Sequence, residues 1–126
     1  MFGANNVERG YIKLWRKTLE SEVFADPILF KLWSYCLLKA NHKTQFVSID
    51  GIARPIKLDP GEFVTGRFLL HKEFYPSNKK SNKSALTLWR KLEILNNMGN
   101  LNIKTMSKCS VISITNWKDY QQTEQI

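Results

Sequence analysis

The segment that most restricts the fold lies in the C-terminal half, where a helical period gives way to an alternating one. Its apolar residues recur three or four positions apart, the spacing of one helix face; they are Ala85, Leu88, Trp89, Leu92 and Leu95. Gly99 is suited to the left-handed cap that ends such a helix. Residues 101–105 and 111–114 then predict two strands joined by a turn at Ser107 and Lys108. We therefore expect a helix followed directly by a β-hairpin.

Two further helices are expected near the N-terminus. The first runs from Tyr11 to Val23, and its apolar stripe is Ile12, Trp15, Leu19 and Val23. A break follows at Asp26, whose side chain can accept hydrogen bonds from free backbone amides, and Pro27 fits a first helical position because no donor is needed there. The nearly continuous apolar run of residues 28–41 predicts a second helix that is buried on most sides.

The period changes to two after the second helix. Residues 45–58 predict a β-hairpin, with Asp50-Gly51 as a type I′ turn because Gly tolerates a positive φ. Pro55 has no amide for a ladder hydrogen bond, so we expect the returning strand at the edge of a sheet.

A turn and a short third helix connect the hairpin to the C-terminal half. Asp59-Pro60-Gly61 predicts a turn before a strand over residues 62–64. Thr65 is expected to cap a helix over residues 66–74. The polar stretch from Tyr75 to Asn82 then predicts a solvated loop before the helix that starts at about Ser84.

Length and charge limit the classes of protein and partner. The chain has 126 residues, which predicts one domain over residues 1–126 with flexible ends at 1–9 and 121–126. Its 19 Lys and Arg against 11 Asp and Glu give a net charge of +8, which favours a polyanionic partner. No apolar run reaches the ~20 residues of a membrane span. The two cysteines form no disulfide framework of the secreted type, so we expect a cytoplasmic protein without a membrane partner.

The positive charge is concentrated where the helices lead into the last hairpin. Between Arg67 and Lys91 the net charge is +6. Helix, connector, basic helix and hairpin is the order of a winged helix-turn-helix, in which the second helix enters the major groove and the hairpin meets the flanking backbone. The expected fold class is thus α+β, a winged helix-turn-helix with an additional N-terminal β-hairpin. The candidate residues for binding DNA are Lys79, Lys80, Lys83, Thr87, Arg90, Lys91, Lys104 and Lys108. The alternative is an ordinary solvated surface.

The aromatic residues suggest a second kind of contact. Trp15, Trp33 and Trp89 lie on apolar helical stripes, so we expect them in the core. Trp117 follows the last strand close to Tyr120, where it can cover the core or meet a second subunit. Ile94 is apolar on an otherwise polar helix face and indicates the same kind of contact.

We find no sequence pattern of an enzyme or a metal site. The chain lacks the GxxxxGK, HExxH and GxSxG motifs. Cys36, His42, His71 and Cys109 do not have the spacing of metal ligands on one helix. We therefore expect no catalytic residue, no metal and no cofactor.

Four short motifs, in their order and spacing, carry a resemblance to a known family. They are residues 10–16 (GYIKLWR), 37–42 (LLKANH), 58–67 (LDPGEFVTGR) and 112–121 (ISITNWKDYQ). With them the chain resembles the N-terminal winged-helix domain of phage replisome-organiser, DnaD-like replication initiation proteins. The resemblance implies a winged-helix fold, self-association, and work at a replication origin where helicase-loading proteins gather.

Three functional hypotheses stay open. The first is a winged-helix module of a phage or prophage replication initiation protein that binds double-stranded DNA. The second is an oligomerisation or protein-interaction module of the replication apparatus with only weak, non-specific DNA affinity; its partners would be a second copy of the chain or helicase-loading proteins. The third is a transcriptional repressor of the same fold, since the physics of docking is common to both roles.

Overall fold

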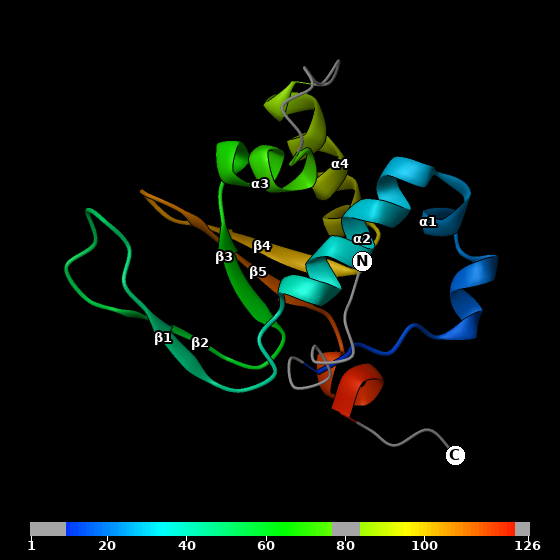
Figure 1. The fold of residues 1–126 in the computed structure, drawn as a ribbon, viewed down its shortest axis with the longest axis horizontal. Helices are drawn as coiled ribbons and strands as arrows, with labels where there is room; N and C mark the ends of the chain where they lie inside the picture. The colour runs from blue at the N-terminus through cyan, green and yellow to red at the C-terminus, as the bar shows by residue number, and fades with distance from the viewer. Residues whose placement is uncertain (1–9, 77–83, 123–126) are drawn as a thin grey trace.

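A computed structural model of the chain describes residues 10–76 and 84–122, and their arrangement is α+β (Figure 1). The helical elements are η2 (Arg16–Glu20), α1 (Glu22–Ala25), α2 (Pro27–Lys39), α3 (Arg67–Phe74), α4 (Ala85–Asn97) and η3 (Lys118–Gln122). The strands are β1 (Gln45–Val47), β2 (Ile56–Leu58), β3 (Glu62–Thr65), β4 (Leu101–Thr105) and β5 (Ser110–Ile114). The predicted flexible end at residues 1–9 lies outside the described residues.

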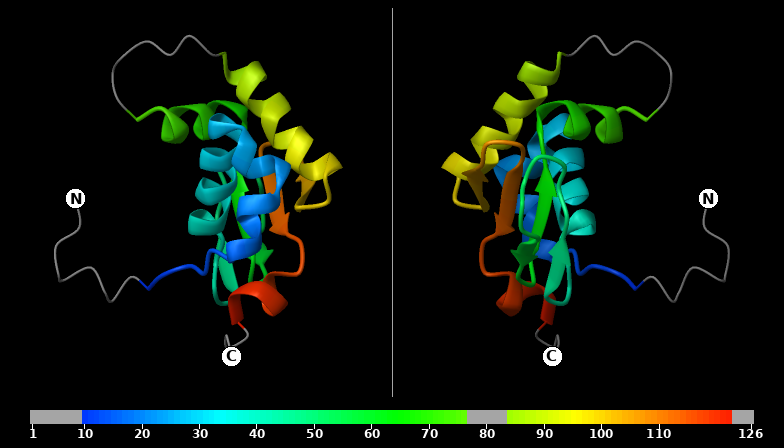
Figure 2. Two further views of the ribbon diagram at one scale, coloured as in Figure 1. Left: turned by 90° about the vertical axis from the view of Figure 1, so that its right-hand side faces the viewer. Right: turned by 90° about the vertical axis from the view of Figure 1, so that its left-hand side faces the viewer.

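Strands β3, β5 and β4 form an antiparallel sheet in that order. Phe63 lies opposite Ile112, which lies opposite Ile103, so this row of side chains shares one face. Figure 2 shows this sheet between α2 on one side and the β1–β2 hairpin on the other. We call the face toward α2 the inner face and the face toward the hairpin the outer face. The chain order α2, β3, α3, α4, β4, β5 confirms the predicted sequence of elements.

The core lies between the inner face and the helices. Leu32 and Cys36 of α2, Leu92 and Leu95 of α4, and Ile112 of β5 are each 0% exposed. The helix stop predicted at Gly99 is confirmed. Its φ is +85°, its amide donates to the Asn96 carbonyl and the Asn100 amide donates to the Leu95 carbonyl. This pair of bonds is a Schellman cap, which ends α4, and β4 follows directly.

The predicted start of α2 is confirmed as well. Asp26 Oδ1 accepts from the amides of Ile28 at 3.0 Å and Leu29 at 3.2 Å, and Pro27 occupies the first helical position.

The prediction of one helix from Tyr11 to Val23 is wrong. Residues 10–15 are not helical, Arg16–Glu20 is a 3₁₀ helix, and α1 is a single turn that begins after Ser21. The backbone of Lys13 forms hydrogen bonds with the C-terminal segment instead. Lys13 N donates to Gln121 Oε1 at 2.8 Å, and Gln121 Nε2 donates to Lys13 O at 2.8 Å. Long-range pairing with the C-terminal segment therefore replaces helical bonds that the apolar spacing alone predicts.

The hairpin over residues 45–58 is confirmed, but its turn type is not. Strands β1 and β2 pair over only three residues each, which leaves residues 48–55 as the connection. The Ile52 amide donates to the Ile49 carbonyl, and Gly51 has φ +86° whereas Asp50 has no positive φ. A type I′ turn needs positive φ at both central residues, so this is a type II arrangement.

The predicted cap of the third helix is also wrong. Thr65 is buried at the end of β3 at 2% exposure, and Gly66 precedes α3 without a capping side chain. Because one more strand residue pairs, Thr65 with Ser110, the helix starts one position later. The turn at Asp59-Pro60-Gly61 is confirmed by the bond from the Glu62 amide to the Asp59 carbonyl and by the φ of +88° at Gly61.

Candidate nucleic-acid interface

The side of α4 that faces away from the core is open. Ser84 caps the helix by accepting from the Thr87 amide at 3.1 Å, and its hydroxyl is 2.9 Å from the Thr87 hydroxyl. Thr87, Arg90 and Glu93 are exposed on this side, and neither Arg90 nor Glu93 forms an ion pair with a described residue. Leu86 and Ile94, each 41% exposed, complete it. We call these five residues the α4 face; Arg90 is its one cation.

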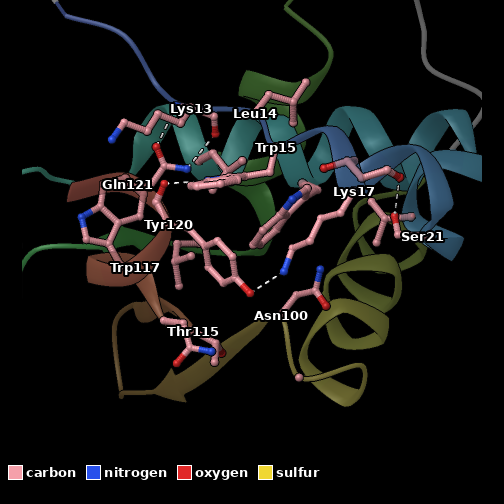
Figure 3. A pocket seen from close by; sticks show the side chains of 17 residues that line it. Lys13, Leu14, Trp15, Lys17, Ser21, Asn100, Thr115, Trp117, Tyr120 and Gln121 are labelled. Carbon is pink, nitrogen blue, oxygen red and sulfur yellow. Dashed lines mark hydrogen bonds between the residues drawn. The ribbon is translucent and has the colours of Figure 1, made fainter. Parts of the chain in front are cut away.

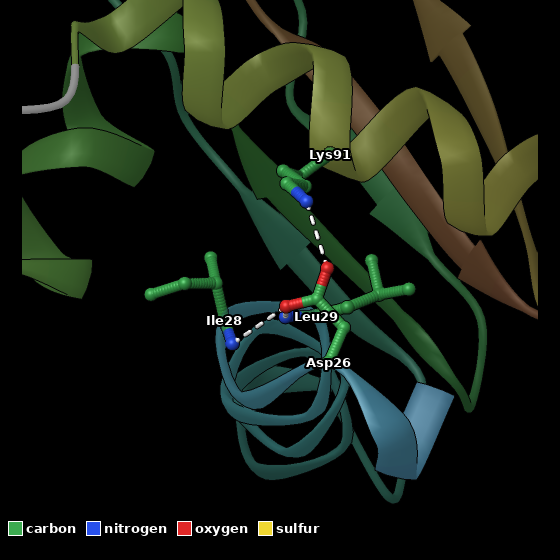
Figure 4. A network of polar contacts seen from close by, with 4 residues as sticks. All are labelled: Asp26, Ile28, Leu29 and Lys91. Atoms are coloured by element: carbon green, nitrogen blue, oxygen red, sulfur yellow. Dashed lines mark hydrogen bonds and ion pairs between the residues drawn. The ribbon is translucent and has the colours of Figure 1, made fainter. Parts of the chain in front are cut away.

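Lys91, a second candidate on α4, is turned toward the protein instead. Its ammonium group lies 2.7 Å from Asp26 Oδ2, while Asp26 Oδ1 caps α2 (Figure 4). The hydrogen bond from Lys91, followed by the bond from the Leu29 amide, lowers the pKa of Asp26 below its ordinary value. Lys91 thus joins α4 to the start of α2, and its charge is matched within the chain.

The basic stretch between Arg67 and Lys91 is only partly described. Lys79, Lys80 and Lys83 lie outside the described residues. Glu73, the acidic residue of this stretch, accepts from Tyr35 Oη at 2.5 Å and from Lys39 Nζ at 3.2 Å. The Tyr35 bond, and to a smaller extent Lys39, lower the pKa of Glu73, whereas burial followed by that carboxylate raises the pKa of Tyr35. Glu73 is therefore occupied in holding α3 to α2.

The two lysines predicted on the last hairpin are exposed. Lys104 of β4 lies opposite Val111 on the outer face. Lys108, in the turn between β4 and β5, lies over the backbone of Gly51, where an added Cβ would come within 3.0 Å of Lys108 Cε. Neither lysine forms an ion pair with a described residue. The tip of the β1–β2 connection and the β4–β5 turn are thus in contact.

A cavity of about 470 Å³ separates the β1–β2 hairpin from the outer face, and we call it the outer cavity. Ile52, Arg54 and Lys57 line it from the hairpin side. Lys104 and Val111 line it from the sheet. Arg54 was not among the candidates from the sequence, because only the fold brings residues 54 and 104 to the same space. The one signal in the sequence was a cation in the loop beside Pro55.

The carboxylates at the outer cavity are already engaged. Asp59 Oδ1 lies 3.9 Å from Lys57 Nζ. Glu62 accepts from the Asp59 amide at 2.8 Å through Oε1 and from the Ser113 hydroxyl at 2.6 Å through Oε2. Arg54 and Lys104 form no ion pair with a described residue, and Glu62 forms none either, so the lining carries three cations against two carboxylates.

Two of the three candidates for subunit contact are used inside the chain (Figure 3). Trp117 is 4% exposed, and its Cβ lies 2.7 Å from the position that a Cβ on Gly61 would take. Tyr120 packs edge-on against Trp15 with ring centroids 5.8 Å apart, and its hydroxyl accepts a hydrogen bond from Lys17. Of the two roles left open for Trp117, covering its own core is the one observed. Ile94 alone of the three is exposed on α4.

The expected flexible end does not begin at Gln121. This residue is 8% exposed and forms the two-way bond with Lys13 described above, and Gln122 Nε2 donates to the His42 carbonyl at 3.3 Å. Residues 123–126 lie outside the described residues.

The described residues do not form two other kinds of site. No cluster of three or more His, Cys, Asp or Glu there could hold a metal ion. Within the same residues, no helix has both the length and the apolar character of a membrane span. Comparison of the chain with protein-family models, curated proteins and solved structures gives no match.

Proposed function

We propose that this chain is a winged helix-turn-helix module that binds duplex DNA. The observation that carries the proposal is the connection α2, β3, α3, α4, β4, β5 with strand order β3-β5-β4, in which the exposed α4 leads directly into a β-hairpin. In a winged helix, the element in the position of α4 enters the major groove and the hairpin meets the neighbouring backbone. We call β4, β5 and their turn the wing.

The exposed candidate residues of α4 and the wing then have distinct parts in binding. Arg90 can donate two hydrogen bonds to a guanine edge, and Thr87 can contact a base or a phosphate. Lys104 and Lys108 on the wing are suited to phosphates, since lysine acts as a point charge. Lys91 is left out of this set because Asp26 matches its charge. Lys79, Lys80 and Lys83 stay predicted contacts.

The biological role within this proposal is replication initiation in a phage or prophage. It rests on the sequence resemblance to DnaD-like proteins, above all on residues 58–67 and 112–121. The first motif contains β3 and the second contains the last three residues of β5, and these strands pair with each other. A transcriptional repressor would use the same docking geometry, so origin DNA and operator DNA are distinguished by the bound sequence alone.

The test of DNA binding is an Arg90→Ala variant in fluorescence anisotropy with labelled duplexes. Loss of a bidentate contact to guanine costs about 1–3 kcal/mol of discrimination, so binding should weaken about tenfold or more on a selected site. Arg16→Ala is the matched control, because Arg16 is exposed on η2, which contributes no residue to the α4 face. Equal affinities for Arg90→Ala, Arg16→Ala and the unaltered chain would contradict a reading role for α4.

The second candidate function, a protein-interaction module, is favoured by the apolar part of the α4 face. Leu86 and Ile94 are each 41% exposed there, and Met98 is 38% exposed at the end of the same helix. Under this hypothesis Ile94→Asp would convert an oligomer into a monomer in sedimentation velocity, whereas Leu38→Asp, on α2, would not. A chain that is monomeric at all concentrations removes self-association as its role.

A further inference from the structure

We propose that the β1–β2 hairpin and the wing together form a composite phosphate-binding surface for duplex DNA, made by Arg54, Lys104 and Lys108. The inference rests on the proposed function and deepens it: the hairpin is assigned a part in DNA binding that a winged helix-turn-helix alone does not have. Its basis is the juxtaposition of cations from two separate hairpins around the outer cavity.

The contact between the two hairpins brings the three cations together. Lys108 lies against Gly51, so the tip of the β1–β2 connection is held at the wing turn. Three residues along from Gly51, Arg54 lines the outer cavity, which Lys104 lines from β4. Figure 2 shows the hairpin lying along this side of the sheet. The hairpin connection therefore adds the positive charge of Arg54 beside the lysines of the wing.

The charges of the neighbouring carboxylates decide whether this surface is net positive or net negative. Asp59 pairs with Lys57, whereas Glu62 accepts only uncharged hydrogen bonds and keeps its negative charge. Arg54, Lys57 and Lys104 still outnumber the two carboxylates in the lining, and Arg54, Lys104 and Lys108 form no ion pair with a described residue. Three unmatched cations at one surface raise the local concentration of an anionic ligand.

Exposure indicates an extended anion rather than a small one. Arg54, Lys104 and Lys108 are all exposed, and they come from two separate hairpins. Phosphates that follow one another along a duplex backbone can meet such a row, and each neutralised phosphate releases counterions. The surface adds affinity without reading bases, because contacts to phosphate carry no sequence information directly.

The experiment compares the double variant Arg54→Ala with Lys104→Ala against the unaltered chain in duplex binding at several salt concentrations. Two lost phosphate contacts should reduce the slope of log affinity against log salt by about 1.8 and weaken binding by about 10- to 100-fold at moderate salt. The matched control is Arg16→Ala with Lys43→Ala, which removes two exposed cations elsewhere. An unchanged slope in the Arg54/Lys104 variant, or an equal loss in the control, overturns the inference.

A substitution that is expected to strengthen duplex binding gives an independent test. Asp59→Asn removes a carboxylate from the outer cavity and releases Lys57, so it should tighten duplex binding severalfold. Unchanged or weaker binding by this variant counts against the composite surface. If the unaltered chain shows no salt-dependent duplex binding, the proposed function fails and the inference with it. If Arg90→Ala weakens binding while the Arg54/Lys104 variant does not, the inference alone fails.

Discussion

The two faces of the β3-β5-β4 sheet differ in what covers them. On the inner face, the row of Phe63, Ile112 and Ile103 packs against helices, and Ile112 is 0% exposed. On the outer face, the next row contains Val111 and Lys104, and the β1–β2 hairpin leaves a cavity of about 470 Å³ over it. Close packing on one face indicates that the inner face stabilises the fold, whereas the proposed phosphate contacts lie on the side of the outer face.

The largest expected effect comes from truncating the inner face. Ile112→Ala should lower the free energy of unfolding by about 2–5 kcal/mol, because a fully buried aliphatic side chain leaves a cavity. Its neighbour Val111 is 6% exposed under the hairpin, and Val111→Ala should cost only about 1–2 kcal/mol, mainly the transfer free energy of the lost methyl groups. Urea denaturation of both variants measures the difference; equal losses would contradict the division between the faces.

A smaller loss is expected at Gly61, which lies beneath Trp117 at the start of β3. Gly61→Ala forces a side chain into φ +88° and places its Cβ 2.7 Å from Trp117 Cβ. Strain and overpacking together should cost about 2–4 kcal/mol in the free energy of unfolding. Gly99→Ala is the control, since Gly99 has a similar φ of +85° but nothing within 4 Å of the added Cβ. Equal melting temperatures for the two variants would rule out the Trp117 contact as a cause.

The ion pair between α2 and α4 is expected to contribute still less. Asp26 and Lys91 are each about one-third exposed, so Lys91→Met should cost under about 1 kcal/mol at neutral pH. Because the folded-state pKa of Asp26 is lowered below its ordinary 3.8, this contribution is present above that pH and is lost as the pH falls through the folded-state value.

The pH dependence of unfolding checks this directly. In urea titrations at neutral pH and below pH 3.8, the difference between Lys91→Met and the unaltered chain should shrink on acidification. A difference that is the same at both pH values would show that the ion pair is not its source.

The smallest effect on stability is expected on the outer face. Arg54→Ala and Lys104→Ala should each change the free energy of unfolding by no more than about 0.5 kcal/mol, since both side chains are exposed and unpaired in the described structure. Thermal unfolding followed by circular dichroism measures this. A loss comparable to that of Ile112→Ala would mean that these cations hold the hairpin to the sheet.

The sequence predicted the elements whose signals are local. The Asp26-Pro27 start of α2, the apolar stripe of α4 and the Gly99 stop each depend on residues within one or two helical turns. The N-terminal helix was predicted wrongly because bonds to Gln121, more than a hundred residues away, decide the local backbone. Thr65 failed as a cap because pairing with Ser110 extends β3.

The residues of the candidate site also differ in whether local spacing or long-range packing determines their positions. Arg90 could be predicted to point outward, because helical spacing places it away from the stripe of Leu88, Leu92 and Leu95. The pairing of Lys91 with Asp26 and the approach of Arg54 to Lys104 depend on how distant segments pack. Spacing along the chain carries no information on either pair, so the sequence analysis grouped Lys91 with the outward cations and did not include Arg54 among the candidates.

The most direct test of the account is the salt dependence of duplex DNA binding by the unaltered chain. If Arg54, Lys104 and Lys108 each neutralise a phosphate, log affinity should fall against log salt with a slope of about −2.7 or steeper, at about −0.9 per phosphate. Affinity that is independent of salt, or no binding at low salt, would contradict DNA recognition by α4 and the hairpin-covered wing.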